Sequence, residues 1–116
     1  MWTPVTISEL HEVILIGERK LDIELFNFWH LIKIYPEKWQ EKEHGTEGGG
    51  FWVVAILGKR IVWYNDIEEG FNISEYSNYG FIDEYASDDF EINHVVNQLF
   101  NLIKSKEDKA GVNTNL

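Results

Sequence analysis

The strongest constraint on the fold is a pair of apolar segments joined by a two-residue connection that begins with Gly58. The segments are FWVVAIL at residues 51–57 and RIVWYN at residues 60–65. The first is apolar at consecutive positions, which is typical of a strand that is covered on both faces. Glycine supplies the positive φ that a tight hairpin turn requires. The pattern therefore predicts an antiparallel hairpin at the centre of a sheet, with Trp52 or Trp63 largely buried.

An N-terminal helix is predicted near residues 7–16. Thr6 and Glu9 have the spacing of a capping box, in which each side chain accepts a hydrogen bond from the other residue's backbone amide. The apolar residues that follow lie on one helical face, and Gly17 is a plausible stop.

A second helix is predicted near the C-terminus. Ser87 is a suitable N-cap, and Asp88 and Asp89 would fall in the first turn, where the helix dipole favours negative charge. Apolar residues then recur with helical spacing. They are Ile92, Val95, Val96, Leu99, Phe100 and Ile103.

Three further strands are predicted with weaker patterns. The chain up to about Asn27 reads as a short helical or irregular turn, followed by a strand at 29–35. Pro36 would end this strand because proline cannot donate to a strand ladder. Segments 71–76 and 80–85 read as two more strands, separated by the turn SNYG.

The order of these elements predicts the α+β class, with a mainly antiparallel sheet and an N-terminal and a C-terminal helix packed on it. A chain of 116 residues, 44% of them apolar, is expected to form one domain with one substantial core. We assign residues 1–106 to this single domain and residues 107–116 to a flexible C-terminal tail.

Cysteine is absent from the sequence, so neither disulfides nor thiolate metal sites are expected. The N-terminal segment has neither the basic region nor the long apolar stretch of a signal peptide. No apolar run is long enough to span a membrane. These features favour the cytoplasm.

The charge balance is strongly acidic, with a net charge of −10. Such a balance argues against a nucleic-acid binder and against docking on an anionic membrane. The distribution is uneven, because no Lys or Arg lies between Arg60 and Lys104. The acids in this interval are Asp66, Glu68, Glu69, Glu75, Asp83, Glu84, Asp88, Asp89 and Glu91. One side of the fold should therefore have a strong negative potential.

No catalytic or metal-binding motif is recognisable. The four histidines are not spaced as metal ligands, and the glycines at 48–50 lack the residues that follow in a phosphate-binding loop. Paired carboxylates within 66–68 or 83–84 could perform acid–base chemistry, but acids adjacent on a strand point to opposite faces. We therefore predict no enzymatic activity, no cofactor and no metal.

Several tyrosines lie near turns and close to acids. Aromatic rings beside carboxylates suit a basic protein partner, because the rings supply contact area and the carboxylates pair with Lys and Arg. Two other interpretations remain: the aromatics pack the hairpins with only their polar tips exposed, and NDIEEG at 65–70 is a solvated turn of an acidic protein.

The segment from about residue 29 to residue 103 resembles small bacterial immunity proteins of toxin systems, including contact-dependent growth inhibition. The resemblance is centred on GGGFWV, WYNDIEEGFN and EY. It implies a cytoplasmic protein that binds and neutralises a cognate toxin domain by stoichiometric occlusion. Many such toxins are nucleases, whose basic clefts hold phosphates.

Taken with the charge distribution, this resemblance predicts a partner-binding surface for a basic protein. We expect the surface to include Tyr64, Asp66, Glu68, Glu69, Asp83 and Glu84. Two alternatives stay open at this point: a small enzyme that uses a carboxylate pair, and a structural module that associates with itself.

Overall fold

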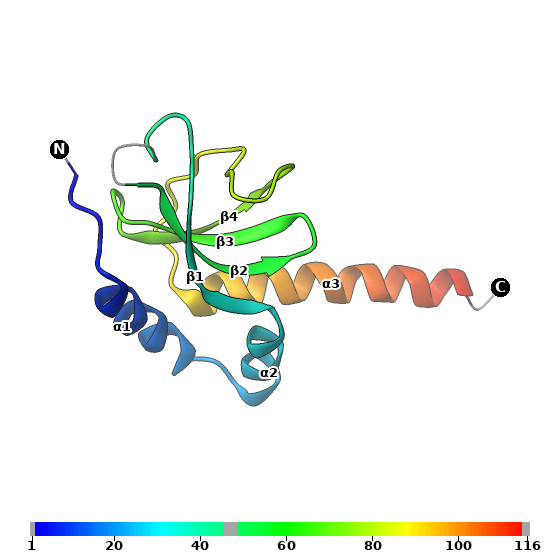
Figure 1. Cartoon of the computed structure of the whole chain (residues 1–116). Coiled ribbons are helices and arrows are strands. Elements are labelled where there is room, and N and C mark those ends of the chain that lie inside the picture. The colour runs from blue at the N-terminus through cyan, green and yellow to red at the C-terminus, as the bar shows by residue number, and fades with distance from the viewer. Residues whose placement is uncertain (1, 46–48, 115–116) are drawn as a thin grey trace.

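The computed structural model of this chain describes residues 2–45 and 49–114. These residues form helices on a four-stranded antiparallel sheet, which confirms the predicted α+β class (Figure 1). The elements, in order, are α1 (Ile7–Glu18), α2 (Ile23–Ile32), β1 (Lys33–Trp39), β2 (Phe51–Leu57), β3 (Arg60–Asn65), β4 (Gly70–Glu75) and α3 (Ile92–Thr114).

The sheet has the order β1-β2-β3-β4, so the predicted hairpin of β2 and β3 is central. Gly58 has a φ of 59°, as its place in the tight turn requires. The register between β2 and β3 shifts between Val53 and Ala55. This irregularity lets Val54 and Ala55 both face the helices, where a regular strand would alternate.

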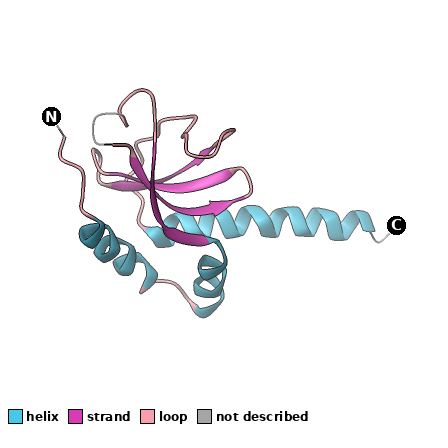
Figure 2. Ribbon diagram, in the orientation of Figure 1, coloured by secondary structure: helices cyan, strands magenta, loops and turns pink. Residues whose placement is uncertain are grey.

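Both faces of the sheet are covered, as Figure 2 shows. The helices cover one face, and the long segment between β4 and α3 covers the other. We call this segment, residues 76–91, the covering segment. Trp63 is fully buried beneath it, and Ile82 from the covering segment packs into the same cluster. Trp52 lies on the helical side and is only partly buried.

The predicted capping box at the start of α1 is confirmed. Thr6 Oγ1 accepts from the Glu9 amide at 3.2 Å, and Glu9 Oε1 accepts from the Thr6 amide at 3.0 Å. The prediction that Gly17 stops the helix is wrong, because α1 continues through Glu18. A Cβ at Gly17 would lie 2.7 Å from the Cβ of Ile92, so this glycine permits the close approach of α1 to α3.

The region before β1 differs from the prediction. Residues 23–32 form α2, where we expected a turn followed by a strand from residue 29. Asp22 caps this helix by accepting from the Leu25 amide at 2.9 Å. Pro36 lies within β1 and does not end it. The strand tolerates proline because β1 is an edge strand whose register is irregular at this point.

The predicted strand at 80–85 is also wrong. Within it, only Phe81 forms a bridge, an isolated parallel one to Gln40. The backbone of this region is a coil. The Gly80 carbonyl and the Ile82 amide bond to the backbone of Gln40, and the Glu84 carbonyl accepts from the buried Ser74 hydroxyl.

The last helix begins later than predicted. It starts at Ile92, so Ser87 is not its N-cap, and Asp88 and Asp89 precede the first turn. The helix also continues to Thr114, through most of the region that we expected to be a tail, and Figure 1 shows its C-terminal half extending beyond the sheet. In the described part of the chain, no helix is both long enough and apolar enough to cross a membrane.

Candidate partner-binding site

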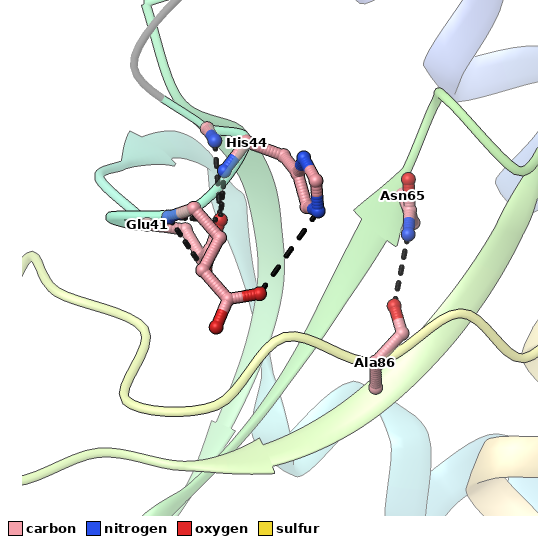
Figure 3. Close-up of polar contacts among 6 residues, drawn as sticks. Glu41, His44, Asn65 and Ala86 are labelled. Carbon is pink, nitrogen blue, oxygen red and sulfur yellow. Dashed lines mark hydrogen bonds and ion pairs between the residues drawn. The ribbon is translucent and has the colours of Figure 1, made fainter.

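The acidic turn, residues 66–69, connects β3 to β4 and is fixed by one buried side chain. Asn65 is fully buried, and its Oδ1 accepts from the amides of Ile67 at 3.1 Å and Glu68 at 3.2 Å. Its Nδ2 donates to the carbonyl of Ala86 at 2.8 Å, as Figure 3 shows. A single amide side chain therefore holds both the acidic turn and the covering segment in place.

Two of the predicted contact residues lie below the surface. Asp66 is 8% exposed, and its Oδ2 accepts from the Val5 amide at 2.9 Å, which ties the N-terminal segment to the turn. Tyr64 is 5% exposed, and its ring packs against Phe71 with the centroids 4.8 Å apart. These two residues support the turn from within.

The pKa values in this region reflect burial among negative charges. Burial raises the pKa of Asp66, an effect partly offset by the Val5 amide and by the charge of Lys38. Burial also raises the pKa of Tyr64, and the charges of Glu69, Asp66 and Glu9 raise it further. Carboxylates from α1 and from the acidic turn thus raise the pKa of the same phenol.

The other predicted acids are exposed, but they occupy two areas. Glu68 and Glu69 project from the acidic turn. Gly70 follows them directly, and a Cβ there would lie 2.2 Å from the carbonyl oxygen of Asp88 and 2.3 Å from the Cα of Asp89. The turn therefore shares one end of the sheet with the exposed Asp88 and Asp89 rather than with residues 83–84.

Asp83 and Glu84 lie further back along the covering segment, and both are exposed. A buried relay fixes their backbone: Trp63 Nε1 donates to Ser74 Oγ at 2.9 Å, and Ser74 Oγ donates to the Glu84 carbonyl at 3.0 Å. The Asp83 carboxylate accepts from Ser77 Oγ at 2.7 Å, which orients it across the local turn.

Exposed aromatic side chains accompany these two acids. Tyr79 is 62% exposed and Phe81 is 56% exposed. The Tyr79 hydroxyl donates to the carboxylate of Glu37, which also accepts from Trp39 Nε1 at 3.1 Å. These hydrogen bonds, the one from Tyr79 first, lower the pKa of Glu37 and keep its carboxylate ionised beside the aromatic rings.

A buried carboxylate that the sequence did not reveal organises the loop after β1. Glu41 is 2% exposed, and its carboxylate accepts from the amides of Glu43, His44 and Gly45, with the shortest distance 2.7 Å to His44 (Figure 3). Gly45 is needed there, because a Cβ would lie 2.8 Å from that of Glu41. In the sequence, this arrangement is indicated only by the spacing of Glu41 and Gly45, which are four residues apart.

A cleft between α1, α2 and β1 has a volume of about 480 Å³. Its acidic group is Glu18, whose carboxylate accepts from Trp29 Nε1 at 2.6 Å and from Lys33 Nζ at 3.2 Å. Both contacts of this carboxylate are therefore made within the fold. Across the described residues, no group of three His, Asp or Glu side chains is arranged to hold a metal ion.

The arrangement at the acidic turn and along the covering segment is therefore suited to electrostatic binding. It consists of exposed carboxylates on a backbone fixed by buried polar side chains, with exposed aromatics along the covering segment. Comparison with known proteins adds nothing to this description: no protein-family model matches the chain, and no curated protein or solved structure is significantly similar to it.

Proposed function

We propose that this chain is an immunity protein, which binds the toxin domain of a contact-dependent growth inhibition or related toxin system in the cytoplasm and neutralises it by occlusion. The proposal combines the resemblance of GGGFWV, WYNDIEEGFN and EY to such proteins with the physical character of the surface. The observation that carries it is the acidic turn, where Glu68 and Glu69 are exposed on a backbone that Asn65 fixes.

Negative charge at a fixed position favours a basic partner. A nuclease toxin needs a basic cleft to hold phosphates, and carboxylates can occupy that cleft in their place. Complementary charge raises association rates by roughly ten to a thousandfold, which matters for an inhibitor that must act before the toxin cuts. The sequence from residue 61 to residue 103 has neither Lys nor Arg, although Lys38 acts on Asp66 and Lys20 pairs with Glu91 at 2.8 Å.

The covering segment supports the proposal with a second kind of contact. Tyr79 and Phe81 are large, exposed and close in sequence to Asp83 and Glu84. Aromatic side chains supply much of the energy at protein interfaces, whereas rim carboxylates mainly affect the association rate. We expect the acidic turn to steer the toxin and the aromatic residues to slow its release.

The proposal predicts a toxin gene next to the gene for this chain, and the test is protection of bacteria that produce the toxin domain of that gene. We expect growth to be restored when the chain is co-produced, and we expect the purified pair to form a complex of one copy of each protein in size-exclusion chromatography with light scattering. The double variant Glu68→Lys/Glu69→Lys should protect less well, because its charge reversal lies at the steering surface.

Glu75→Lys is the matched control for the single charge reversal Glu68→Lys. Glu75 is exposed and lies at the opposite end of β4 from the acidic turn, so Glu75→Lys changes the net charge as much as Glu68→Lys does. Its ion pair with Arg60, at 3.9 Å, is exposed and contributes little to stability. The immunity function is refuted if the folded wild-type chain neither binds the toxin domain nor restores growth.

A further inference from the structure

An apolar groove lies between α2 and α3, away from the acidic turn. It has a volume of about 490 Å³. The rings of Phe28 and Phe100 line it and meet edge to face, with centroids 5.3 Å apart. The groove is lined by Glu24, Phe28, Leu31 and Ile32 from α2, Leu57 from β2, and Phe100, Ile103 and Lys104 from α3.

One side chain at this groove is unusually exposed. Leu31 is 84% exposed although it lines an apolar depression. A single exposed leucine is common on protein surfaces, but an exposed leucine on the wall of an apolar groove forms a projection beside a hole. A patch that contains both is complementary to a copy of itself.

The charges at the groove are also self-complementary. Glu24 lies on the α2 wall and Lys104 on the α3 wall. Among the side chains that the structure describes, which end at residue 105, neither has an ion-pair partner, and the Lys104 Nζ lies 6.0 Å from the centroid of the Phe100 ring. The groove is thus balanced in charge within a chain of net charge −10. Net charge of this size opposes self-association, and the repulsion between two copies is weaker where the facing surfaces are locally balanced in charge.

We propose that this groove is a two-fold interface between two copies of the chain. Each copy inserts Leu31 into the groove of the other, and Glu24 of each copy faces Lys104 of the other. Two-fold symmetry requires that one patch carry both members of every contact, and this patch supplies an apolar projection with an apolar hole and an acid with a base.

The length of α3 supports this assignment. The helix has 23 residues, and its C-terminal half extends beyond the sheet of its own chain (Figure 1). Short helical segments are marginal in water without packing against another element. A second copy docked on the groove lies next to the start of this extension and supplies such a surface.

Sedimentation equilibrium over a concentration series tests the interface without the toxin. We expect the wild-type chain to shift with concentration from 13.6 kDa to twice that mass. Leu31→Asp should weaken dimerisation at least about a hundredfold, because it places a charge in an apolar groove. Tyr35→Asp is the control: Tyr35 is 75% exposed on β1 and lies outside the groove, so this variant should dimerise as the wild type does.

Charge exchange tests the geometry. Glu24→Lys alone and Lys104→Glu alone should each weaken the dimer by about tenfold, and the double exchange should restore it at unchanged net charge. Circular dichroism checks that every variant is folded. A wild-type chain that remains monomeric at every concentration overturns the interface, as does a Leu31→Asp dimer as strong as the wild type. If the double exchange does not restore dimerisation, Glu24 of one copy does not lie opposite Lys104 of the other.

Discussion

Replacing Asn65 by alanine should loosen the acidic turn and the covering segment together. The side chain is fully buried, accepts two amide hydrogen bonds from the turn and donates one to the Ala86 carbonyl. Alanine satisfies none of these groups. The substitution therefore removes a support of the acidic turn and leaves the exposed carboxylates of Glu68 and Glu69 unchanged.

The magnitude follows from the three lost partners. The bond to the Ala86 carbonyl is partly buried, and its loss costs about 0.5–1.5 kcal/mol. The amides of Ile67 and Glu68 are also partly buried, so water can replace the lost acceptor and each costs about 0.5–1 kcal/mol. We expect Asn65→Ala to lower the free energy of unfolding by about 1.5–3.5 kcal/mol.

Urea unfolding followed by tryptophan fluorescence measures this loss. Asn97→Ala is the matched control, because Asn97 is exposed on α3 and donates only to the Asn93 carbonyl of its own helix, at 2.9 Å. The control should change stability by less than about 0.5 kcal/mol. Hydrogen exchange of Asn65→Ala should also accelerate at residues 67–68 and in the covering segment. If Asn65→Ala is as stable as the control, the buried amide does not anchor the turn.

Three further changes test other parts of the structure. Because burial raises the pKa of Asp66, its ionised form destabilises the fold at neutral pH, and this cost disappears as the pH falls through the raised pKa. Asp66→Asn should therefore gain stability relative to the wild type as the pH rises above about 4, and a difference in melting temperature that does not change with pH would contradict this. Gly17→Ala should cost about 1–3 kcal/mol in urea unfolding, since the new methyl group would overlap Ile92; an unchanged midpoint would refute the close contact. Ser74→Ala should also cost about 1–3 kcal/mol and should speed hydrogen exchange around Glu84, whereas normal protection there would show that the relay is not needed.

The parts of the fold that could be predicted are those with a strong local pattern. The hairpin at 51–65 is apolar on both faces and has a glycine at its turn, so its position at the centre of the sheet could be predicted. The helix α2 was missed because its apolar residues fit neither period cleanly, and Asp22 was not recognised as its N-cap. Pro36 does not mark the end of β1, since an irregular edge strand can contain proline.

The covering segment could not be predicted because long-range polar contacts fix its path. Asn65, Asn72 and Ser74 are buried polar residues of the strands, and each bonds to the backbone of the covering segment. Asn72 Oδ1 accepts from the Asp88 amide at 2.7 Å, which holds the chain extended where we had expected a helix to begin. Such pairings join residues ten or more positions apart, and no local periodicity records them.

The residue types of the candidate site could be predicted from the sequence, but the burial of each side chain could not. The exposure of Glu68 and Glu69 follows from their place at a turn, as we expected. Asp66, in the same acidic run, turns inward to bind the Val5 amide. That contact joins residues 61 positions apart, so the acidic run alone could not distinguish a carboxylate that faces a partner from one that supports the turn.

The most direct test of the account is the rate at which the toxin domain binds Glu68→Lys over a salt series, compared with the wild type and with Glu75→Lys. If the acidic turn steers a basic partner, Glu68→Lys should lower the association rate at low ionic strength by about threefold to tenfold, and the difference should shrink as salt screens the charges. Glu75→Lys should have the smaller effect. An association rate for folded Glu68→Lys that equals the wild-type rate at every salt concentration would contradict the claim that this turn is the docking surface.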